Sequence, residues 1–445
     1  MRRAFLALGI LMALVAAARQ RSVRFPDPPP TQAGPTFSKE VVRIFQDHCQ
    51  TCHHPGDIAP FSLMSYADAL PRAADIKYMT QTHQMPPWKP VEGCGEFDAA
   101  RVLTQSEIDT LTQWVDHGAP EGNRADLPEP LNFSSGWAAG PPDLVLSNPD
   151  AYTPPSSGDM YRCFTIPTNL TSTTYVAGID VHPGDRQTVH HVIAYLDYGN
   201  ASVTLDEKDP GPGYTSFGGP GFDNPGALGG WAPGARPIML PDGVAMELPA
   251  ASRVVLQVHY HPHGPIVADK TEIGIYYAKT KPSKILRILP LINTDFTIPP
   301  GDGNYKVTAT FPIATPVATH LWWIAPHMHL LGRKMQVEAT AIGTQQTRCL
   351  ININDWDFNW QGLYKYKEAI ALPPLTRLTA TAYYDNSPEN WRNPNSPPKA
   401  VSWGEQTTDE MCIAFLGVTI DSENLSTGQR ADTRWIPPLF PARAR

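Results

Sequence analysis

Most of the sequence after Tyr161 consists of short runs that alternate apolar and polar residues or are apolar throughout. Pro, Gly, Asn or Asp ends each run, as in 174–181, 189–196, 253–260 and 272–278. Runs of this length and period are typical of antiparallel strands joined by turns. The 47 prolines and 33 glycines also suit a turn-rich β-sandwich better than a helical bundle.

The same texture repeats after about Lys284, and 445 residues exceed the usual size of one domain. Thr104 to Glu107 form a capping box before a helical apolar pattern, so the region before the strands is expected to be helical. The predicted parts are a signal peptide (1–18), a helical domain (35–120), a Pro-rich linker (121–141) and two sandwiches (142–283 and 284–445).

The N-terminus has the pattern of a secretory signal. Arg2 and Arg3 precede an apolar run that ends in the small residues 16–18. We expect cleavage near Ala18 and an exported, periplasmic protein, with an uncleaved anchor as the alternative. No later segment reaches the roughly 20 apolar residues of a spanning helix. The net charge of -8, without a run of Lys or Arg, argues against a nucleic-acid partner.

Cys49-Gln50-Thr51-Cys52-His53 is a C-x-x-C-H motif. In an exported chain this motif indicates a covalently attached c-type haem, with two thioether bonds and the histidine as an axial iron ligand. A zinc knuckle or a redox C-x-x-C is the alternative, but no second pair of zinc ligands follows nearby.

An electron-transfer haem needs a sixth ligand, and Met85 is our first candidate because prolines at 86 and 87 would stiffen its loop. His83, Met79 and Met64 compete for this role. Cys94, Cys163, Cys349 and Cys412 remain and allow three disulfide pairings. Among these we favour Cys349 with Cys412.

Histidines gather in three of the predicted strands. His327 and His329 are two residues apart, so their side chains should share one face of a strand. His190 and His191 are adjacent, and joint ligation would need a strand end, a bulge or different ring nitrogens. His259 lies in the third run, two residues after Gln257. Three imidazoles suit copper or zinc, although any of these histidines could instead be structural.

Five motifs in one order resemble the copper type II, ascorbate-dependent monooxygenases, the class of peptidylglycine hydroxylating and dopamine β-monooxygenases. They are the His190-His191 run, 257–260, 327–329, 331–333 and 409–412. The resemblance covers about 142–419 and implies two jelly-roll sandwiches, each carrying one copper. The helical domain resembles the cytochrome c domains that are fused to other periplasmic enzymes.

The resemblance assigns ligands to two copper ions. His190, His191 and His259 correspond to the electron-transfer copper, and Gln257 to a residue that supports it. The oxygen-binding copper, where catalysis takes place, corresponds to His327, His329 and Met411. A thioether beside two imidazoles favours Cu(I), although a methionine in a strand is more often part of a core.

The sequence departs from the peptide-hydroxylating branch where that branch binds a peptide carboxylate. Ala325 replaces its arginine, and Ile413 and Phe415 replace an Asn and a Tyr. Glycine-extended peptides are therefore not expected as substrates. Nearby aromatic residues fit an apolar or aromatic substrate, or simple core packing. They are Trp322, Trp323, Trp356, Trp360 and Phe415.

The resulting hypothesis is an exported copper monooxygenase that hydroxylates a C–H bond of a small organic substrate with O2. Its electrons would come from an external donor through the fused haem. One alternative is a non-catalytic haem and copper protein that carries electrons or handles copper. The other is a haem sensor in which the sandwiches bind a partner.

Overall fold

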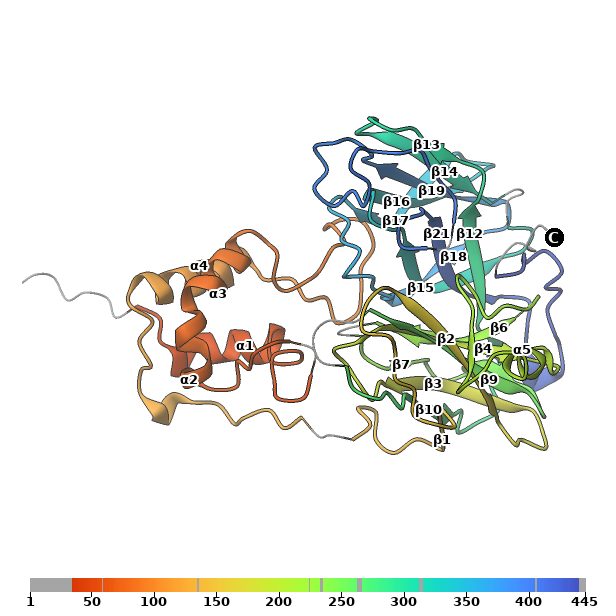
Figure 1. The fold of residues 1–445 in the computed structure, drawn as a ribbon, viewed down its shortest axis with the longest axis horizontal. Helices are drawn as coiled ribbons and strands as arrows, with labels where there is room; N and C mark the ends of the chain where they lie inside the picture. Colours follow the sequence, from red (N-terminus) through yellow and green to blue (C-terminus); the bar gives the residue numbers. More distant parts are fainter. Residues whose placement is uncertain are drawn as a thin grey trace, which may run out of the picture.

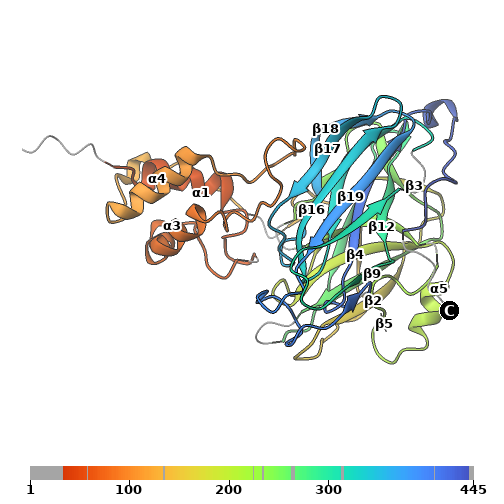
Figure 2. The same cartoon turned by 90° about the horizontal axis from the view of Figure 1, so that it is seen from above.

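In the computed structural model, two β-sandwiches lie against each other and a small helical unit stands to one side of both (Figure 1, Figure 2). The structure describes residues 34–57, 59–133, 136–223, 225–232, 235–261, 266–311, 315–404 and 406–439. The predicted signal peptide, residues 1–18, lies outside these ranges. Within them, no helix has the length and apolar character needed to cross a membrane.

The helical unit surrounds a small core in which Phe37, Leu111 and Trp114 are almost fully buried. Its elements are η1 (Phe37–Val41), α1 (Val42–His48), α2 (Tyr66–Ala69), η2 (Leu70–Arg72), α3 (Ala73–Gln81), α4 (Gln105–Asp116) and η3 (Arg124–Asp126). The predicted capping box is confirmed, since the side chains of Thr104 and Glu107 each bond the other's backbone N–H at the start of α4.

The first sandwich packs two sheets around a shared apolar core. One sheet has the order β1 (Leu144–Ser147), β10 (Glu272–Tyr277), β3 (Thr174–His182), β8 (Val244–Leu248) and β11 (Lys284–Ile285), and β7 (Ile238–Met239) pairs with β3. The other has the order β5 (Tyr214–Thr215), β2 (Met160–Pro167), β9 (Arg253–Tyr260), β4 (Val189–Asp197) and β6 (Gly226–Trp231). A short helix, α5 (Ala201–Asp206), follows β4. The inner faces supply the buried Val, Ile and Leu side chains that the alternating runs predict.

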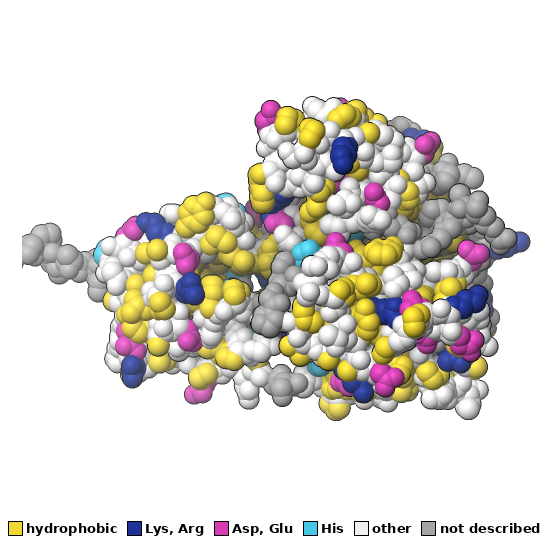
Figure 3. Space-filling view, viewed as in Figure 1, with side chains coloured by type: hydrophobic (Ala, Val, Ile, Leu, Met, Phe, Trp, Pro, Cys, Tyr) yellow, Lys and Arg dark blue, Asp and Glu magenta, His cyan; other side chains and the backbone are white. Residues whose placement is uncertain are grey.

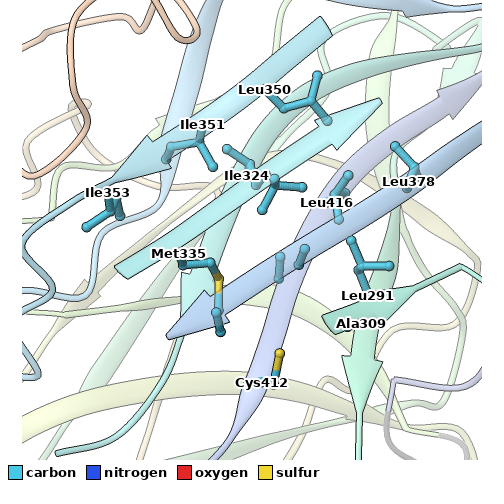
Figure 4. Packing of buried hydrophobic residues seen from close by; sticks show 14 of the residues in the cluster. Leu291, Ala309, Ile324, Met335, Leu350, Ile351, Ile353, Leu378, Cys412 and Leu416 are labelled. Atoms are coloured by element: carbon cyan, nitrogen blue, oxygen red, sulfur yellow. The ribbon is translucent and has the colours of Figure 1, made fainter. Parts of the chain in front are cut away.

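The second sandwich is built in the same way, and Figure 4 shows its core, to which Met335, Ile351 and Leu416 contribute. One sheet has the order β12 (Arg287–Asn293), β21 (Cys412–Ile420), β15 (Thr319–His327) and β18 (Tyr364–Leu372). The other has the order β14 (Tyr305–Thr310), β19 (Thr376–Tyr384), β16 (Gly332–Ala341) and β17 (Gln346–Ile353). The remaining elements are β13 (Thr297–Ile298), β20 (Val401–Ser402) and η4 (Leu425–Thr427).

One tryptophan joins the two sandwiches. Trp323, on β15 of the second sandwich, belongs to the buried apolar cluster of the first. Its indole lies directly over Gly417 on the neighbouring strand, where an added Cβ would come within 2.2 Å of the ring. Only glycine leaves room for this ring, so Gly417 is needed for the contact between the sandwiches.

Residues 86–101, which we call the strap, leave the helical unit between α3 and α4 and cover the second sandwich. The Val91 N–H donates to the Asn352 carbonyl of β17 at 2.9 Å, and the Asp98 N–H donates to the Lys365 carbonyl of β18 at 2.7 Å. Each of these strands forms one of the two edges of its sheet. The strap therefore caps one open side of the second sandwich, and its Phe97 is buried in that core.

A disulfide between Cys94 and Cys349 fixes the strap to β17. The favoured pairing of Cys349 with Cys412 is therefore wrong. Cys412 begins β21 in the opposite sheet, where it is fully buried in the core, whereas Cys349 lies on the edge strand that the strap covers.

Candidate metal centres and the cavity between the sandwiches

Three histidines converge within the first sandwich. His190 and His191 lie on β4, and His259 lies opposite them on β9. The Nδ1 atom of His191 is 3.3 Å from Nδ1 of His190 and 3.4 Å from Nδ1 of His259. The β4–β9 ladder shifts register between Val189 and His191. This bulge lets two adjacent side chains point to one place, which a regular strand would not allow.

Burial favours the neutral form of His191 and His259, which is the form that binds a metal. It lowers the pKa of His191 well below its ordinary value, and the neighbouring histidines lower it further. The pKa of His259 is also lowered by burial, although nearby Asp159 opposes the change. Three converging nitrogen lone pairs without a carboxylate among them could hold a cation such as copper or zinc.

Two further residues support this histidine group. The Tyr161 ring stacks on His259 at 4.1 Å between ring centres. Gln257 does not bond a histidine in the described contacts. Instead its amide nitrogen donates to the carbonyls of Ser216 and Gly219 at 2.9 and 2.8 Å, which fixes a loop beside the group.

The second group lies on the second sandwich. His327 ends β15 and His329 follows it, and their ring centres are 5.1 Å apart. Nδ1 of His327 bonds the Gln361 side chain, and Nδ1 of His329 bonds the Asp409 carbonyl at 3.0 Å. Both rings therefore keep Nε2 for a ligand. Burial lowers the pKa of His327 to about 4 and that of His329 to about 3, so both are neutral at pH 7.

Met411 lines the same cavity as His327 and His329, and a buried carboxyl group connects its backbone to that of His329. Glu410, which is fully buried, accepts backbone N–H groups from His329 at 2.8 Å, Leu331 at 2.6 Å and Met411 at 3.2 Å. Burial raises the pKa of Glu410 to about 8, against the opposing effect of these N–H donors. The carboxyl group thus holds the end of the His-Met-His segment against the start of β21.

Both groups line one cavity of about 630 Å³ between the sandwiches. The Phe358 ring stacks on His190 at 5.2 Å and meets His329 edge-on at 5.9 Å between ring centres, so one phenyl ring contacts a histidine of each group. In the space-filling view, a histidine side chain is visible where the two sandwiches meet (Figure 3). The arrangement can place one small molecule in contact with both groups.

The walls of the cavity are mainly apolar. Ala325, Ile413 and Phe415 form part of the wall beside the second group. Of the predicted aromatic residues, Trp323 and Trp360 also line the cavity. Trp356 is instead buried in the core of the second sandwich, and the Trp322 indole donates to the Thr419 hydroxyl at 3.0 Å.

The C-x-x-C-H motif follows α1 in the helical unit. Nδ1 of His53 bonds the Phe61 carbonyl at 3.0 Å, which leaves Nε2 for a metal. Cys49 lies one turn before His53, whose N–H bonds the Cys49 carbonyl at 2.9 Å, and Cys52 directly precedes it; both cysteines are partly buried. Met85 is in the loop after α3 and is also partly buried. These positions fit a covalently attached haem with His53 as one axial ligand, and the role of Met85 stays a prediction.

Several residues of the site carried no usable sequence signal. Phe358 and Gln361 lie in the loop between β17 and β18, and nothing in their neighbourhood marks them as cavity residues. Asp159 lies in a loop with no motif. Glu410 did lie within a resembling motif, and its position directly before Met411 could have drawn attention to it.

Comparison with known proteins gives one family. No curated protein sequence matches the chain. Solved structures that align with it include the VP2 subviral particle of infectious bursal disease virus, at 11% identity over 64% of this chain and 73% of that chain, with a TM-score of 0.21. The major capsid protein P2 of bacteriophage PM2 aligns at 9% identity over 62% and 97%, with a TM-score of 0.25. With TM-scores this low, neither likeness bears on function.

Residues 282–420 match the family model described as copper type II ascorbate-dependent monooxygenase, C-terminal domain. The match coincides with the second sandwich and spans His327, His329 and Met411. The matched domain supports the copper type II monooxygenase family for this chain and makes the chain an oxygen-incorporating copper oxidoreductase.

Proposed function

We propose that the chain is an exported monooxygenase that hydroxylates a C–H bond of a small organic substrate with O2 and receives electrons through a c-type haem in its helical unit. In this proposal the helical unit is cytochrome c-like and the sandwiches are jelly rolls. The observation that carries the proposal is that histidines of both groups, on different sandwiches, line one cavity, and that the Phe358 ring contacts a histidine of each group.

The two ligand groups differ in the way that two copper sites with different tasks would require. His190, His191 and His259 would hold one copper through three imidazoles, and His327, His329 and Met411 would hold the other through two imidazoles and a thioether. When bound, the copper ions would supply oxygen activation and one-electron transfer. The chain fixes the imidazole orientation through Gln361 and the Asp409 carbonyl, and it keeps the rings neutral through burial.

The cavity wall favours an apolar or aromatic substrate. Beside the second group, Ala325, Ile413 and Phe415 present no charge, so a substrate carboxylate placed there would lose its hydration without gaining a partner. Phe358 and Trp360 offer faces on which an aromatic ring could stack. The same walls exclude water from the C–H bond that reacts.

Contacts between the helical unit and the first sandwich support electron delivery through the haem motif. Arg236 donates to the Thr51 hydroxyl at 2.7 Å, inside the C-x-x-C-H segment. Arg186 pairs with Asp57 at 2.9 Å, a few residues beyond the motif. Arg236 also lines the cavity. A haem attached at Cys49 and Cys52 would supply a one-electron carrier on this side of the cavity.

Export is consistent with the disulfide between Cys94 and Cys349, because such bonds persist mainly outside the reducing cytosol. With the signal-like N-terminus, this favours the periplasm as the compartment.

The test is an anaerobic titration of Cu(II) into the copper-free protein with reduced haem, followed by the haem absorbance. We expect haem oxidation with two copper equivalents per chain and the loss of about one equivalent in each of His190→Ala and His327→Ala. His320→Ala is a matched control, because His320 lies on β15 but pairs with Asp421 at 2.7 Å, outside the residues that line the cavity.

Slow haem oxidation, or oxidation that the two substitutions do not change, would exclude electron transfer between the haem and these sites. Full copper binding without O2 consumption in the presence of apolar and aromatic compounds would instead favour the carrier function.

A further inference from the structure

Asp159, in the loop before β2, contacts a histidine of the first ligand group and a residue of the turn that precedes Met411 in the second. One carboxylate oxygen, Oδ1, bonds Nδ1 of His261 and lies 3.3 Å from Nε2 of His259. The other, Oδ2, accepts the Thr407 hydroxyl at 2.7 Å. His259 belongs to the first sandwich and Thr407 to the second, so one side chain spans the interface between them.

The contact with His259 bears on which nitrogen of that ring can bind a metal. The Nε2 atom of His259 is fully buried and makes no well-formed hydrogen bond in the structure. A buried N–H without an acceptor costs roughly 1–3 kcal/mol, so a small ring rotation that directs Nε2–H to Asp159 is favoured. With the proton on Nε2, the lone pair is on Nδ1, the atom that faces Nδ1 of His191.

The contact with Thr407 bears on the second ligand group. Thr407 lies in the turn that leads to Met411, where the Asp409 N–H bonds the Gln406 carbonyl at 2.8 Å. The carbonyl of Asp409 in turn accepts Nδ1 of His329. A shift of this turn would therefore move an acceptor of one ligand and the backbone of another.

Asp159, His259 and His261 could by themselves take a cation, because their ligand atoms lie within 4.8 Å of one another. The hydrogen bonds argue against a metal here, since Oδ1 already bonds His261 and Oδ2 already accepts the Thr407 hydroxyl. The contacts with His259 and His261 lie within the first sandwich, and the hydrogen bond from Thr407 crosses to the second.

Resting on the proposed function, we infer that Asp159 is a positioning residue that holds His259 with Nδ1 toward the first copper and fixes the Met411 turn across the sandwich interface. A carboxylate behind a metal-bound imidazole makes the ring a stronger donor, which stabilises Cu(II) relative to Cu(I). Asp159 thus acts on both copper sites without touching either.

The test measures copper affinity and reduction potential at one site at a time. His327→Ala leaves only the first site, and His190→Ala leaves only the second. In the first-site protein, we expect Asp159→Ala to weaken Cu(II) binding about 10- to 100-fold, to raise the copper reduction potential and to change the Cu(II) electron paramagnetic resonance spectrum. Asp159→Glu should restore part of each. In the second-site protein, Thr407→Val should weaken copper binding, whereas the same substitution in the first-site protein should leave copper binding unchanged.

Asp143→Asn is the matched control, because Asp143 pairs with the exposed Lys279 on the other sheet of the first sandwich. It should alter neither site. An unchanged potential and affinity in Asp159→Ala would overturn the inference, as would a third copper equivalent lost with Asp159. If Asp159→Ala does not fold, the same two quantities in Asp159→Asn and Thr407→Val decide the question. Failure of the two parent variants to bind one copper each would refute the proposed function itself.

Discussion

Two substitutions of Glu410 should lower the stability of the fold by different amounts, and the hydrogen bonds in the structure allow both free energies to be estimated. The carboxyl group accepts three backbone N–H groups in a fully buried position. Glu410→Ala leaves all three donors without an acceptor, and at about 1–3 kcal/mol each the cost is roughly 3–9 kcal/mol. Glu410→Gln keeps the shape and one acceptor oxygen. That oxygen can still serve the His329 and Met411 donors, which share Oε2, so only the donor of Leu331 is lost, at about 1–3 kcal/mol.

Amide hydrogen exchange of peptides from β15 and β21, read by mass spectrometry, measures these costs locally. We expect exchange about 5- to 150-fold faster in Glu410→Gln, since about 1.4 kcal/mol corresponds to a factor of ten, and a larger acceleration in Glu410→Ala. Glu368→Ala, at an exposed position on β18, should have no effect. Equal acceleration in the two variants, or none in either, would refute the role of the Glu410 carboxyl group as the acceptor of these three donors.

Three further predictions concern other contacts. Replacing Cys94 and Cys349 together by serine should destabilise the chain by up to about 5 kcal/mol, because the disulfide closes a loop of 255 residues. Added reductant should lower the melting temperature of the parent protein but not that of this double variant. Glu423 is fully buried and forms a two-pronged pair with Arg287 at 2.7 and 2.8 Å, so Glu423→Gln should cost about 3–5 kcal/mol at pH 7 in chemical unfolding. Burial alone would raise the pKa of Glu423, but the hydrogen bonds with Arg287 and nearby N–H groups lower it. The ionised carboxylate therefore stabilises the fold above about pH 4. As the pH falls further, the difference in unfolding free energy between variant and parent should shrink. Gln361→Leu removes the acceptor of a ligand histidine and should weaken second-site copper binding about 10- to 100-fold in a competition titration, and an unchanged affinity would argue against its positioning role.

The parts of the fold that follow from local periodicity could be predicted. The β-sandwich prediction is confirmed, because alternating runs must bury one face and turn residues end each strand. The helix at Thr104 followed from its capping box. The rings of His327 and His329 lie 5.1 Å apart as the i, i+2 spacing predicted, although β15 ends at His327 and the contacts of His329 with Glu410 and the Asp409 carbonyl fix the second ring.

Features that depend on contacts between distant segments could not be predicted. The bulge at His190 leaves no mark in the strand sequence, because both a regular and a bulged ladder accept the same residues. The strap has neither helical nor strand periodicity, so its docking and the partner of Cys94 were hidden. Asp159 is likewise meaningful only once the two sandwiches face each other.

The strap also determines whether the sandwiches can be produced without the helical unit. A chain that began after the linker would lack Phe97, which lies within 5.0 Å of the Tyr366 ring, and Trp88, which lies 5.4 Å from the Tyr364 ring, measured between ring centres. The edges formed by β17 and β18 would be open, and the cavity would lose the part of its wall that Trp88 and Arg101 provide. The N-terminal unit is thus not a detachable module. The second sandwich takes part of its core and two of its strand pairings from the strap, so a fusion that exchanges the helical unit for another would have to keep residues 86–101 of this chain.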